Sequence, residues 1–309
     1  MTARVAILLS TYNGDKYLAE QLDSFLTQEH RDWTLFWRDD GSADATVAIM
    51  QAFALRLEPG RCVHVAEPAG RLGVLDSFLT LLRAARPTLA PGDAAAFADQ
   101  DDVWLPHKLA RGVAMLGDVP AGIPALYCAR QILVDAGLRR TGGSPALIRP
   151  PGFPAALTQN IATGCTILLN HDAASLVAGS RAPAGALHDW WSYLLVAAGG
   201  GRVIADDMPA LLYRQHGGNV VGSRRSRARR AMAALRRGPG PFMADLARHL
   251  DGLAANADAL TASARRDIDT LRAALAGGTR ERLRALRLPG LRRDHWSEGL
   301  LFRLWFLIG

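Results

Sequence analysis

Short apolar runs alternate with longer segments of helical periodicity through the first 120 residues, and this alternation constrains the fold more than any other feature of the sequence. The apolar runs predict buried strands at residues 4–10, 34–37, 61–67 and 94–99. Between these runs, apolar side chains recur every three or four residues, as they do on one face of a helix. Strands that alternate with helices form right-handed βαβ units. We therefore expect an α/β fold with a mainly parallel sheet that is flanked by helices.

The pattern is less regular after Leu116. Further strands are predicted at residues 125–134, 165–170 and 209–216, and further helices at residues 171–179 and 189–200. From Arg224 onward, we find only Ala-, Leu- and Arg-rich helical segments that Gly and Pro separate. We therefore expect one α/β domain at residues 1–222 and a basic helical region at residues 223–309.

The composition is that of an ordinary globular protein, with 49% hydrophobic residues in a chain of 309. Cys62, Cys128 and Cys165 are odd in number and far apart, so they form neither a disulfide framework nor a CxxC metal or redox motif. A reducing cytoplasm is the expected compartment. Residues 300–309 are the longest apolar stretch after the first strand, but Arg303 interrupts it and a bilayer span needs roughly 20 residues. We expect no signal sequence and no transmembrane segment.

Positive charge is concentrated toward the C-terminus. The net charge is +7 and the pI is about 9.9, and residues 224–309 contain 18 Lys and Arg against 8 Asp and Glu. Such a region favours nucleic acid, an anionic membrane or an acidic substrate as a partner. An Arg- and Ala-rich composition would give the same excess without any partner, so the charge alone leaves the choice open.

Polar side chains follow several predicted strands at the point where each strand ends, which is where open α/β sheets bind their ligands. They are Ser10, Thr11, Tyr12 and Asn13 after the first strand, Asp39 and Asp40 after the second, and Asp99, Asp101 and Asp102 after the fourth. The first turn lacks the GxGxxG pattern, and no GxxxxGK[ST] occurs in the chain. The sequence therefore disfavours a Rossmann dinucleotide site and a P-loop.

The acidic cluster predicts a divalent cation. Crowded carboxylates repel each other unless a cation or hydrogen bonds neutralise them, and an Asp-x-Asp segment places Asp99 and Asp101 on the same side of an extended chain. Oxygen ligands favour Mg2+ or Mn2+, and both ions keep coordination positions for substrate phosphates. The alternative is a structural role, in which Asp102 caps a helix that begins near Pro106.

Three segments match one known family in their order, spacing and flanking residues. They are AILLSTYNGDKYLAEQLDSFLTQ at residues 6–28, RDDGSADAT at residues 38–46 and FADQDDVWLPHKL at residues 97–109. Together they resemble the family 2 glycosyltransferases, which have the GT-A nucleotide-diphospho-sugar fold. The resemblance continues through NIATGCTILLN, HDWWSYLLV and YRQHGGNVVG, as in bacterial rhamnosyltransferase-like members, and it covers about residues 4–222.

This resemblance implies an inverting, metal-dependent transferase and gives each polar strand-end residue a role. Thr11, Tyr12 and Asn13 would line the nucleotide pocket, Asp39 with help from Asp40 would accept a hydrogen bond from the pyrimidine imide, and Asp99 would lie at the ribose or sugar. Asp101 would hold the Mn2+ or Mg2+ that bridges the two phosphates.

The resemblance also implies roles for four residues of the second half of the chain. Asp189 would be the catalytic base that takes the proton of the acceptor hydroxyl. Many relatives have Glu-Asp at these positions, so His188 replaces the Glu, and its alternative role is to cap the following helix. His216 would contact the metal or the diphosphate, with a surface histidine as the alternative, and Arg214 would pair with the same negative charge.

Two other functions fit parts of the sequence. AFADQDDVW also satisfies the D-x-D-x-[TV] pattern of haloacid-dehalogenase-like phosphotransferases, but that family has the motif on its opening strand, whereas here it follows the fourth. A non-catalytic nucleic-acid-binding protein would use the basic region, but the acidic strand ends would repel its phosphates. We therefore expect a nucleotide-sugar donor and a saccharide or lipid-linked acceptor as partners, and no nucleic acid.

The donor and the C-terminal region complete the expectations. The HDWW and YRQHGGN segments favour dTDP-L-rhamnose as the donor, with a UDP-hexose next. Seven arginines between Arg224 and Arg237 precede an apolar end at residues 296–308. Arginines with aromatic residues suit peripheral binding to the anionic inner face of the cytoplasmic membrane. The alternative is that the apolar end packs on the α/β domain or in a dimer interface.

Overall fold

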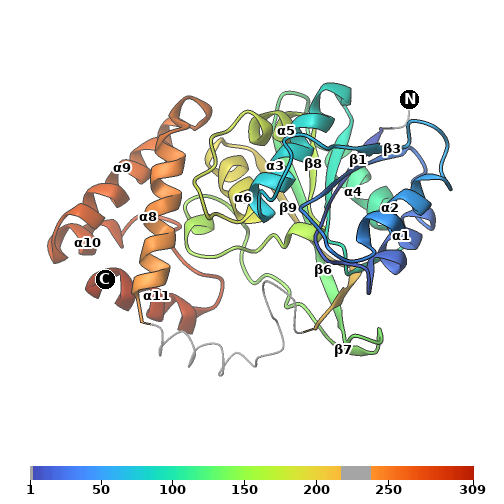
Figure 1. Ribbon diagram of the computed structural model, residues 1–309. Coiled ribbons are helices and arrows are strands. Elements are labelled where there is room, and N and C mark those ends of the chain that lie inside the picture. The colour runs from blue at the N-terminus through green and yellow to red at the C-terminus, as the bar shows by residue number, and fades with distance from the viewer. Residues whose placement is uncertain (1–2, 217–237) are drawn as a thin grey trace.

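A nine-stranded sheet forms the centre of the computed structural model, which describes residues 3–216 and 238–309 (Figure 1). The strands are β1 (Val5–Thr11), β2 (Trp33–Asp39), β3 (Cys62–His64), β4 (Ala94–Ala98), β5 (Val103–Trp104), β6 (Ala125–Val134), β7 (Arg140–Gly143), β8 (Leu168–Asn170) and β9 (Arg202–Arg214). Their order in the sheet is β3-β2-β1-β4-β8-β6-β9-β5, and β7 pairs with β6.

Helices cover both faces of the sheet. They are α1 (Leu18–Leu26), α2 (Thr46–Ala54), α3 (Val74–Ala85), α4 (Lys108–Gly117), α5 (His171–Ala178) and α6 (His188–Ala198), followed by α8 (Gly240–Ala254), α9 (Ala262–Ala276), α10 (Thr279–Ala285) and α11 (Trp296–Ile308). The buried apolar residues of α1, α2 and α4 form one core cluster with one face of the sheet, and those of α3, α5 and α6 form a second cluster on the other face. The α/β class with flanking helices and a helical C-terminal region is confirmed.

The sheet is mixed, and the connections explain where its direction changes. β1, β2, β3 and β4 pair in parallel because α1, α2 and α3 connect them as crossovers. β8 is antiparallel to both β4 and β6, β7 is antiparallel to β6, and β5 is antiparallel to β9. β6 and β9 form the remaining parallel pair. The parallel half therefore ends at β4, beside the acidic segment.

The C-terminal helices extend the core cluster of α3, α5 and α6. The His249 ring of α8 lies 4.6 Å from that of Trp190 in α6. Helices α6 and α8 also approach closely at Gly252, where a Cβ would lie 3.1 Å from the Trp191 ring. Leu81 of α3 and Phe306 of α11 belong to the same packed cluster of buried residues, so the two parts share one hydrophobic core. The predicted boundary near residue 222 and the seven arginines from Arg224 to Arg237 lie outside the described residues.

Helix α11 has two different faces. Phe302, Trp305 and Phe306 are buried, and the Phe302 and Trp305 rings lie 5.8 Å and 5.9 Å from that of Phe242. Side chains four residues apart form an exposed apolar stripe on the other face: Trp296, Leu300, Leu304 and Ile308. The described helices include none long and apolar enough to cross a bilayer.

Candidate active site

The turn after β1 is fixed to the ends of β2 and β4. Gln100 accepts a hydrogen bond from the Tyr12 N–H at 2.8 Å and donates one to the Tyr12 carbonyl at 2.9 Å. Asn13 has a positive φ of 46° and accepts the Ala43 N–H at 2.9 Å. A Cβ at Gly14 would meet Gln100 at 2.3 Å, so only glycine fits there. Sequence reasoning missed Gln100, because a glutamine between aspartates carries no signal of this contact.

Thr11 and Asp39 meet at the corner between β1 and β2. The Thr11 hydroxyl donates to Asp39 Oδ1 at 2.9 Å, and the Ser42 hydroxyl donates to the same atom at 2.6 Å. The N–H groups of Gly41 and Ser42 donate to Asp39 Oδ2 at 3.1 and 2.7 Å. Four donors therefore hold the partly exposed Asp39 carboxylate in one orientation.

The Tyr12 ring is exposed beside this corner, and the Arg71 guanidinium lies over it, 4.2 Å from its centroid. The predicted nucleotide-pocket residues Thr11, Tyr12, Asn13 and Asp39 thus gather on one side of the sheet edge.

Asp40 has a structural position, which corrects its predicted role beside Asp39. It is 5% exposed and forms an ion pair with Arg38 at 2.7 Å. It also accepts the N–H groups of Leu72 and Gly73 at 2.6 and 2.9 Å. With these partners, Asp40 anchors the loop before α3 instead of facing a nucleotide.

Four buried or partly buried polar side chains form an inner cluster below the end of β4. Oxygen atoms of Asp99 and Asp102 and the sulfur of Cys165 lie within 4.8 Å of one another, so these three residues could hold a metal. The fourth member, Lys108, is fully buried, and its ammonium lies 3.1 Å from the Trp104 ring centroid. Burial next to the carboxylates raises the pKa of the Cys165 thiol well above its usual value. The inner cluster is one candidate metal site, with the Lys108 side chain beside it.

Burial and neighbouring carboxylates also change the charge of the other members of the inner cluster. The pKa of Asp99 is raised to about 7, first by burial and then by the charges of Asp101 and Asp189. Burial lowers the pKa of Lys108 to about 7. Sequence reasoning missed Lys108 and Cys165, because a lysine in the first turn of a helix is usually solvated and a single cysteine outside a CxxC motif carries no signal of this cluster.

Asp102 does not cap α4, so the structural alternative for the acidic cluster is wrong. The N-cap residue is His107, and its side chain makes no capping hydrogen bond. Asp102 is instead fully buried and accepts the Arg214 backbone N–H at 3.1 Å. Through this bond, the inner cluster is joined to the end of β9.

An outer pair lies nearer the surface, where Asp101 Oδ2 and His216 Nε2 are 2.7 Å apart. Both side chains are about one-fifth exposed. Arg214 lies behind this pair and corrects its predicted role, since its guanidinium donates to the carbonyls of Asp101 and Ala136 and pairs with Glu20. Arg214 is 1% exposed, and its bond to the Asp101 carbonyl helps to position Asp101.

Asp189 is the second residue of α6 and faces the segment before β8. The N–H groups of Gly164 and Trp190 donate to its carboxylate at 3.1 and 2.6 Å, and the Asn160 side chain also donates to it. Burial outweighs these bonds and raises the pKa of Asp189 to about 6. A carboxylate with this pKa is mostly ionised at neutral pH and is a stronger base than a solvated aspartate.

His188 packs in the core and does not cap α6, because the N-cap residue is Leu187. Its ring stacks on Phe78 at 3.9 Å and meets the edge of Phe97. Its ring nitrogens have no hydrogen-bond partner in the described part of the chain, and burial lowers the pKa of His188 to about 3. His188 is therefore a neutral side chain that supports the first turn of α6.

The candidate site thus combines the Thr11–Asp39 corner, a partly exposed carboxylate–imidazole pair and a carboxylate with raised basicity. Residues 6–143 match the family model described as Glycosyl transferase family 2. Over these residues, the chain is similar to the family 2 glycosyltransferases, which are transferase enzymes.

Individual relatives agree with this class. Over 228 residues, the chain is 27% identical to the dTDP-rhamnosyl transferase RfbG of Shigella flexneri. This alignment covers 70% of this chain and 74% of that protein. The next two curated relatives are matched over only 30% and 31% of their own length.

Two solved structures show the same fold. S. aureus TarS in complex with UDP-GlcNAc superposes with a TM-score of 0.60 at 15% identity, over 87% of this chain and 71% of that chain. The mannosyltransferase PcManGT from Pyrobaculum calidifontis, in complex with GDP-Man and Mn2+, gives a TM-score of 0.50 at 20% identity, over 99% of this chain and 88% of that chain.

Proposed function

We propose that this protein is an inverting glycosyltransferase that moves a sugar from a nucleoside-diphosphate donor to a saccharide or lipid-linked acceptor in the synthesis of a cell-surface polysaccharide. One observation carries the proposal: the Thr11–Asp39 corner, the Asp101–His216 pair and Asp189 share one edge of the sheet. The haloacid-dehalogenase-like alternative requires its first Asp on the opening strand, whereas Asp99 follows β4.

In this proposal, Asp189 is the base for a single displacement. Its carboxylate takes the proton of the acceptor hydroxyl while the hydroxyl oxygen attacks the anomeric carbon. The bond from that carbon to the phosphate oxygen breaks, and its electron pair leaves with the nucleoside diphosphate. Attack and departure occur on opposite faces of the sugar, so the configuration inverts.

A divalent cation fits the outer pair better than the inner cluster. Asp101 and His216 offer a carboxylate oxygen and an imidazole nitrogen that are partly exposed, with room for substrate phosphates as further ligands. Bound there, Mn2+ or Mg2+ would neutralise the charge of the leaving diphosphate. Mn2+ accompanies GDP-Man in the similarly folded mannosyltransferase, which supports this choice.

We propose dTDP-L-rhamnose as the donor, with a UDP-hexose as the second candidate. The rhamnosyl transferase that matches 70% of this chain supports the first, and the bound UDP-GlcNAc of the similarly folded TarS fits the second. The test is a panel of nucleotide sugars scored by release of nucleoside diphosphate, with Mn2+, with Mg2+ and with excess chelator. We expect release from dTDP-L-rhamnose only with a cation, and loss of this release in Asp101→Asn. Consumption of UDP-hexoses alone would refute the donor, and full activity in chelator would refute the metal.

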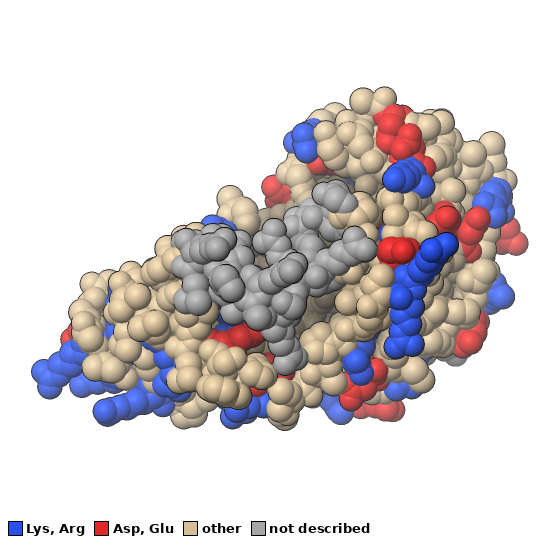
Figure 2. All heavy atoms as spheres, turned by 90° about the horizontal axis from the view of Figure 1, so that it is seen from below, with Lys and Arg blue, Asp and Glu red and all other residues tan. Residues whose placement is uncertain are grey.

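We further propose that the protein docks peripherally on an anionic membrane surface through the exposed stripe of α11. Apolar and aromatic side chains on one helix face can enter the boundary between headgroups and acyl chains. In Figure 2, Lys and Arg side chains stand along the outer edge of the C-terminal helices, while Lys, Arg, Asp and Glu alternate on the α/β part. Docking would bring the enzyme close to a lipid-linked acceptor.

A further inference from the structure

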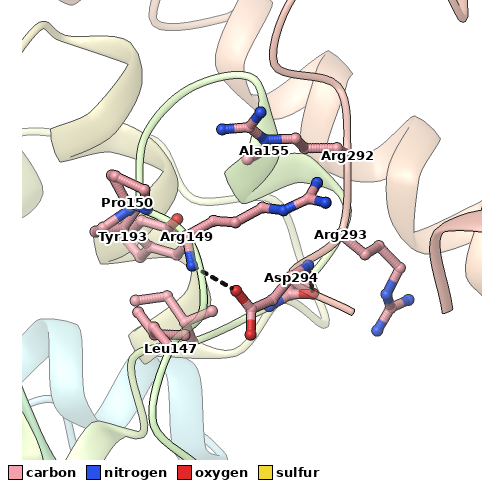
Figure 3. Close-up of a pocket in the computed structure, with 11 residues that line it drawn as sticks. Leu147, Arg149, Pro150, Ala155, Tyr193, Arg292, Arg293 and Asp294 are labelled. Atoms are coloured by element: carbon pink, nitrogen blue, oxygen red, sulfur yellow. Dashed lines mark hydrogen bonds between the residues drawn. The ribbon is translucent and has the colours of Figure 1, made fainter. Parts of the chain in front are cut away.

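An open pocket lies between the α/β domain and the C-terminal helices. Its walls are the loop before β8, helix α6 and the segment that precedes α11 (Figure 3). The pocket is open to solvent, so a group bound at its mouth stays in contact with water. No residue assigned to the donor or the metal lines it.

Two guanidinium groups give the pocket its charge. Figure 3 shows Arg149 and Arg292 reaching across it from opposite walls, while Arg293 points away. Neither Arg149 nor Arg292 has a side-chain hydrogen bond or an ion pair within residues 3–216 and 238–309. Arg293 pairs with Glu298 at 3.4 Å. Two positive charges are therefore available to a ligand.

The single carboxylate in the wall is already engaged. Asp294 Oδ1 accepts the backbone N–H groups of Ile148 and Arg149 at 2.9 and 3.0 Å. The Gln159 side chain in turn accepts the Asp294 N–H at 2.9 Å. These bonds join the two walls, so that Arg149 and Arg292 are held on facing segments. Facing guanidinium forks suit the oxygens of a phosphate, to which each can donate two hydrogen bonds.

The pocket shares helix α6 with the proposed base. Tyr193, in its wall, follows Asp189 by four residues in α6, so both lie on one helix face about one 5.4 Å turn apart. The opposite wall is tied to the same helix, because Trp190 Nε1 donates to the Ala156 carbonyl at 2.8 Å. Asn160, between the lining residues Gln159 and Ile161, donates to Asp189. One turn of helix is comparable to the width of a sugar ring.

We infer that Arg149 and Arg292 bind a phosphate group of the acceptor, and that the acceptor is a glycosyl phosphate or diphosphate whose reactive hydroxyl lies at Asp189. This inference rests on the proposed function, and it specifies the acceptor class. The sugar ring spans from the base to the pocket, and the phosphate is held between the two arginines.

The test compares two acceptors that share one sugar, the free saccharide and its phosphate ester. The ester is supplied both as a water-soluble sugar 1-phosphate and as a diphosphate with a short alkyl chain. In wild-type protein, we expect kcat/KM to be at least tenfold higher for a phosphate ester than for the free saccharide. In Arg149→Gln/Arg292→Gln this preference should fall to near one, through KM, while Arg149→Lys/Arg292→Lys retains part of it. A preference for the sugar 1-phosphate would indicate a soluble acceptor, and a preference for the alkyl diphosphate would indicate a lipid-linked one.

Controls separate this inference from the proposed function. Arg265→Gln removes an exposed arginine of α9 outside the pocket and should leave the preference unchanged. Nucleoside diphosphate binding, followed by calorimetry, should be equal in wild type and the double Gln variant. Thermal unfolding should confirm that the variant is folded. An unchanged preference in the folded double variant overturns the inference. Absence of turnover with every donor would instead overturn the proposed function. In that case, binding of the alkyl diphosphate to wild type and its loss in the double variant would still support phosphate binding by Arg149 and Arg292.

Discussion

At the scale of residues, Asp189 gives the clearest prediction about pH. Burial raises its pKa to about 6, and the base must be unprotonated to accept the hydroxyl proton. We therefore expect kcat/KM to be constant above about pH 7 and to fall tenfold per pH unit well below pH 6. Asp189→Asn should lose most of kcat while keeping donor affinity, and exposed Asp207→Asn is the matched control. An acidic limb centred near pH 4 would contradict the assignment.

Lys108 gives a prediction about stability. Its ammonium is the buried cation nearest Asp99 and Asp102, and removing one partner of a buried charge group leaves the others uncompensated. We expect Lys108→Met to lower the free energy of unfolding by about 3 kcal/mol.

The measurement for Lys108 is urea unfolding at pH 7. Lys16→Met, which removes an exposed lysine, is the control. A stability of Lys108→Met equal to wild type would show that Lys108 does not compensate the carboxylates.

The sequence predicted the residues of the site better than their partners. Thr11, Asp39, Asp101 and His216 could be singled out because strand ends meet at one edge and because their motifs occur in a fixed order. The positions of Asp40 and Arg214 could not, since both depend on contacts with residues far along the chain, Leu72 and Glu20. A motif identifies which polar residues are present, but burial and pairing decide which of them face the ligand.

At the scale of elements, the first turn of α6 depends on Gly164. A Cβ at this position would lie 2.6 Å from His188 Nε2 and 3.5 Å from the Asp189 Cβ. Phe78 and Phe97 hold the His188 ring, so it cannot move aside freely. We expect Gly164→Ala to cost about 1–3 kcal/mol of stability and to lower kcat, with donor affinity retained.

The experiment measures thermal unfolding and kinetics in Gly164→Ala, in His188→Ala and in the double variant. Because His188→Ala removes the obstructing ring, the Gly164→Ala effect should shrink in that background. Gly117→Ala, whose Cβ would meet nothing within 4 Å, is the control. Full additivity of the two changes would rule out the clash.

Most elements could be predicted from periodicity, including β6 over residues 125–134 and the crossover helices of the parallel half. The short strand β5 and the first half of β9 could not. Each pairs with a strand distant in sequence, and residues 202–208 of β9 carry charged and polar side chains that give no apolar run. In such strands, tertiary pairing decides the structure and local sequence does not.

At the scale of the whole molecule, α11 allows a sharper membrane test than truncation. Phe302 and Phe306 belong to the shared core, so removal of the C-terminal region would expose buried side chains. The variant Leu300→Ser/Leu304→Ser changes only the exposed stripe. We expect wild-type protein to sediment with anionic liposomes at low salt and this variant to remain in solution.

The control for the membrane test is Leu283→Ser, which removes an exposed leucine of α10 outside the stripe. Liposomes of neutral lipid test the contribution of charge. Equal sedimentation of wild type and the stripe variant would end the proposal of docking through α11.

The packing of α8 against α6 limits how such enzymes can be recombined. A chimera joined near residue 222 would combine Trp190 and Trp191 of one parent with the counterparts of His249 and Gly252 from another. A side chain larger than glycine at the last position would push α8 away and shift the helix that carries Asp189. Exchange of acceptor specificity between parents therefore requires α6 to be transplanted together with the C-terminal helices.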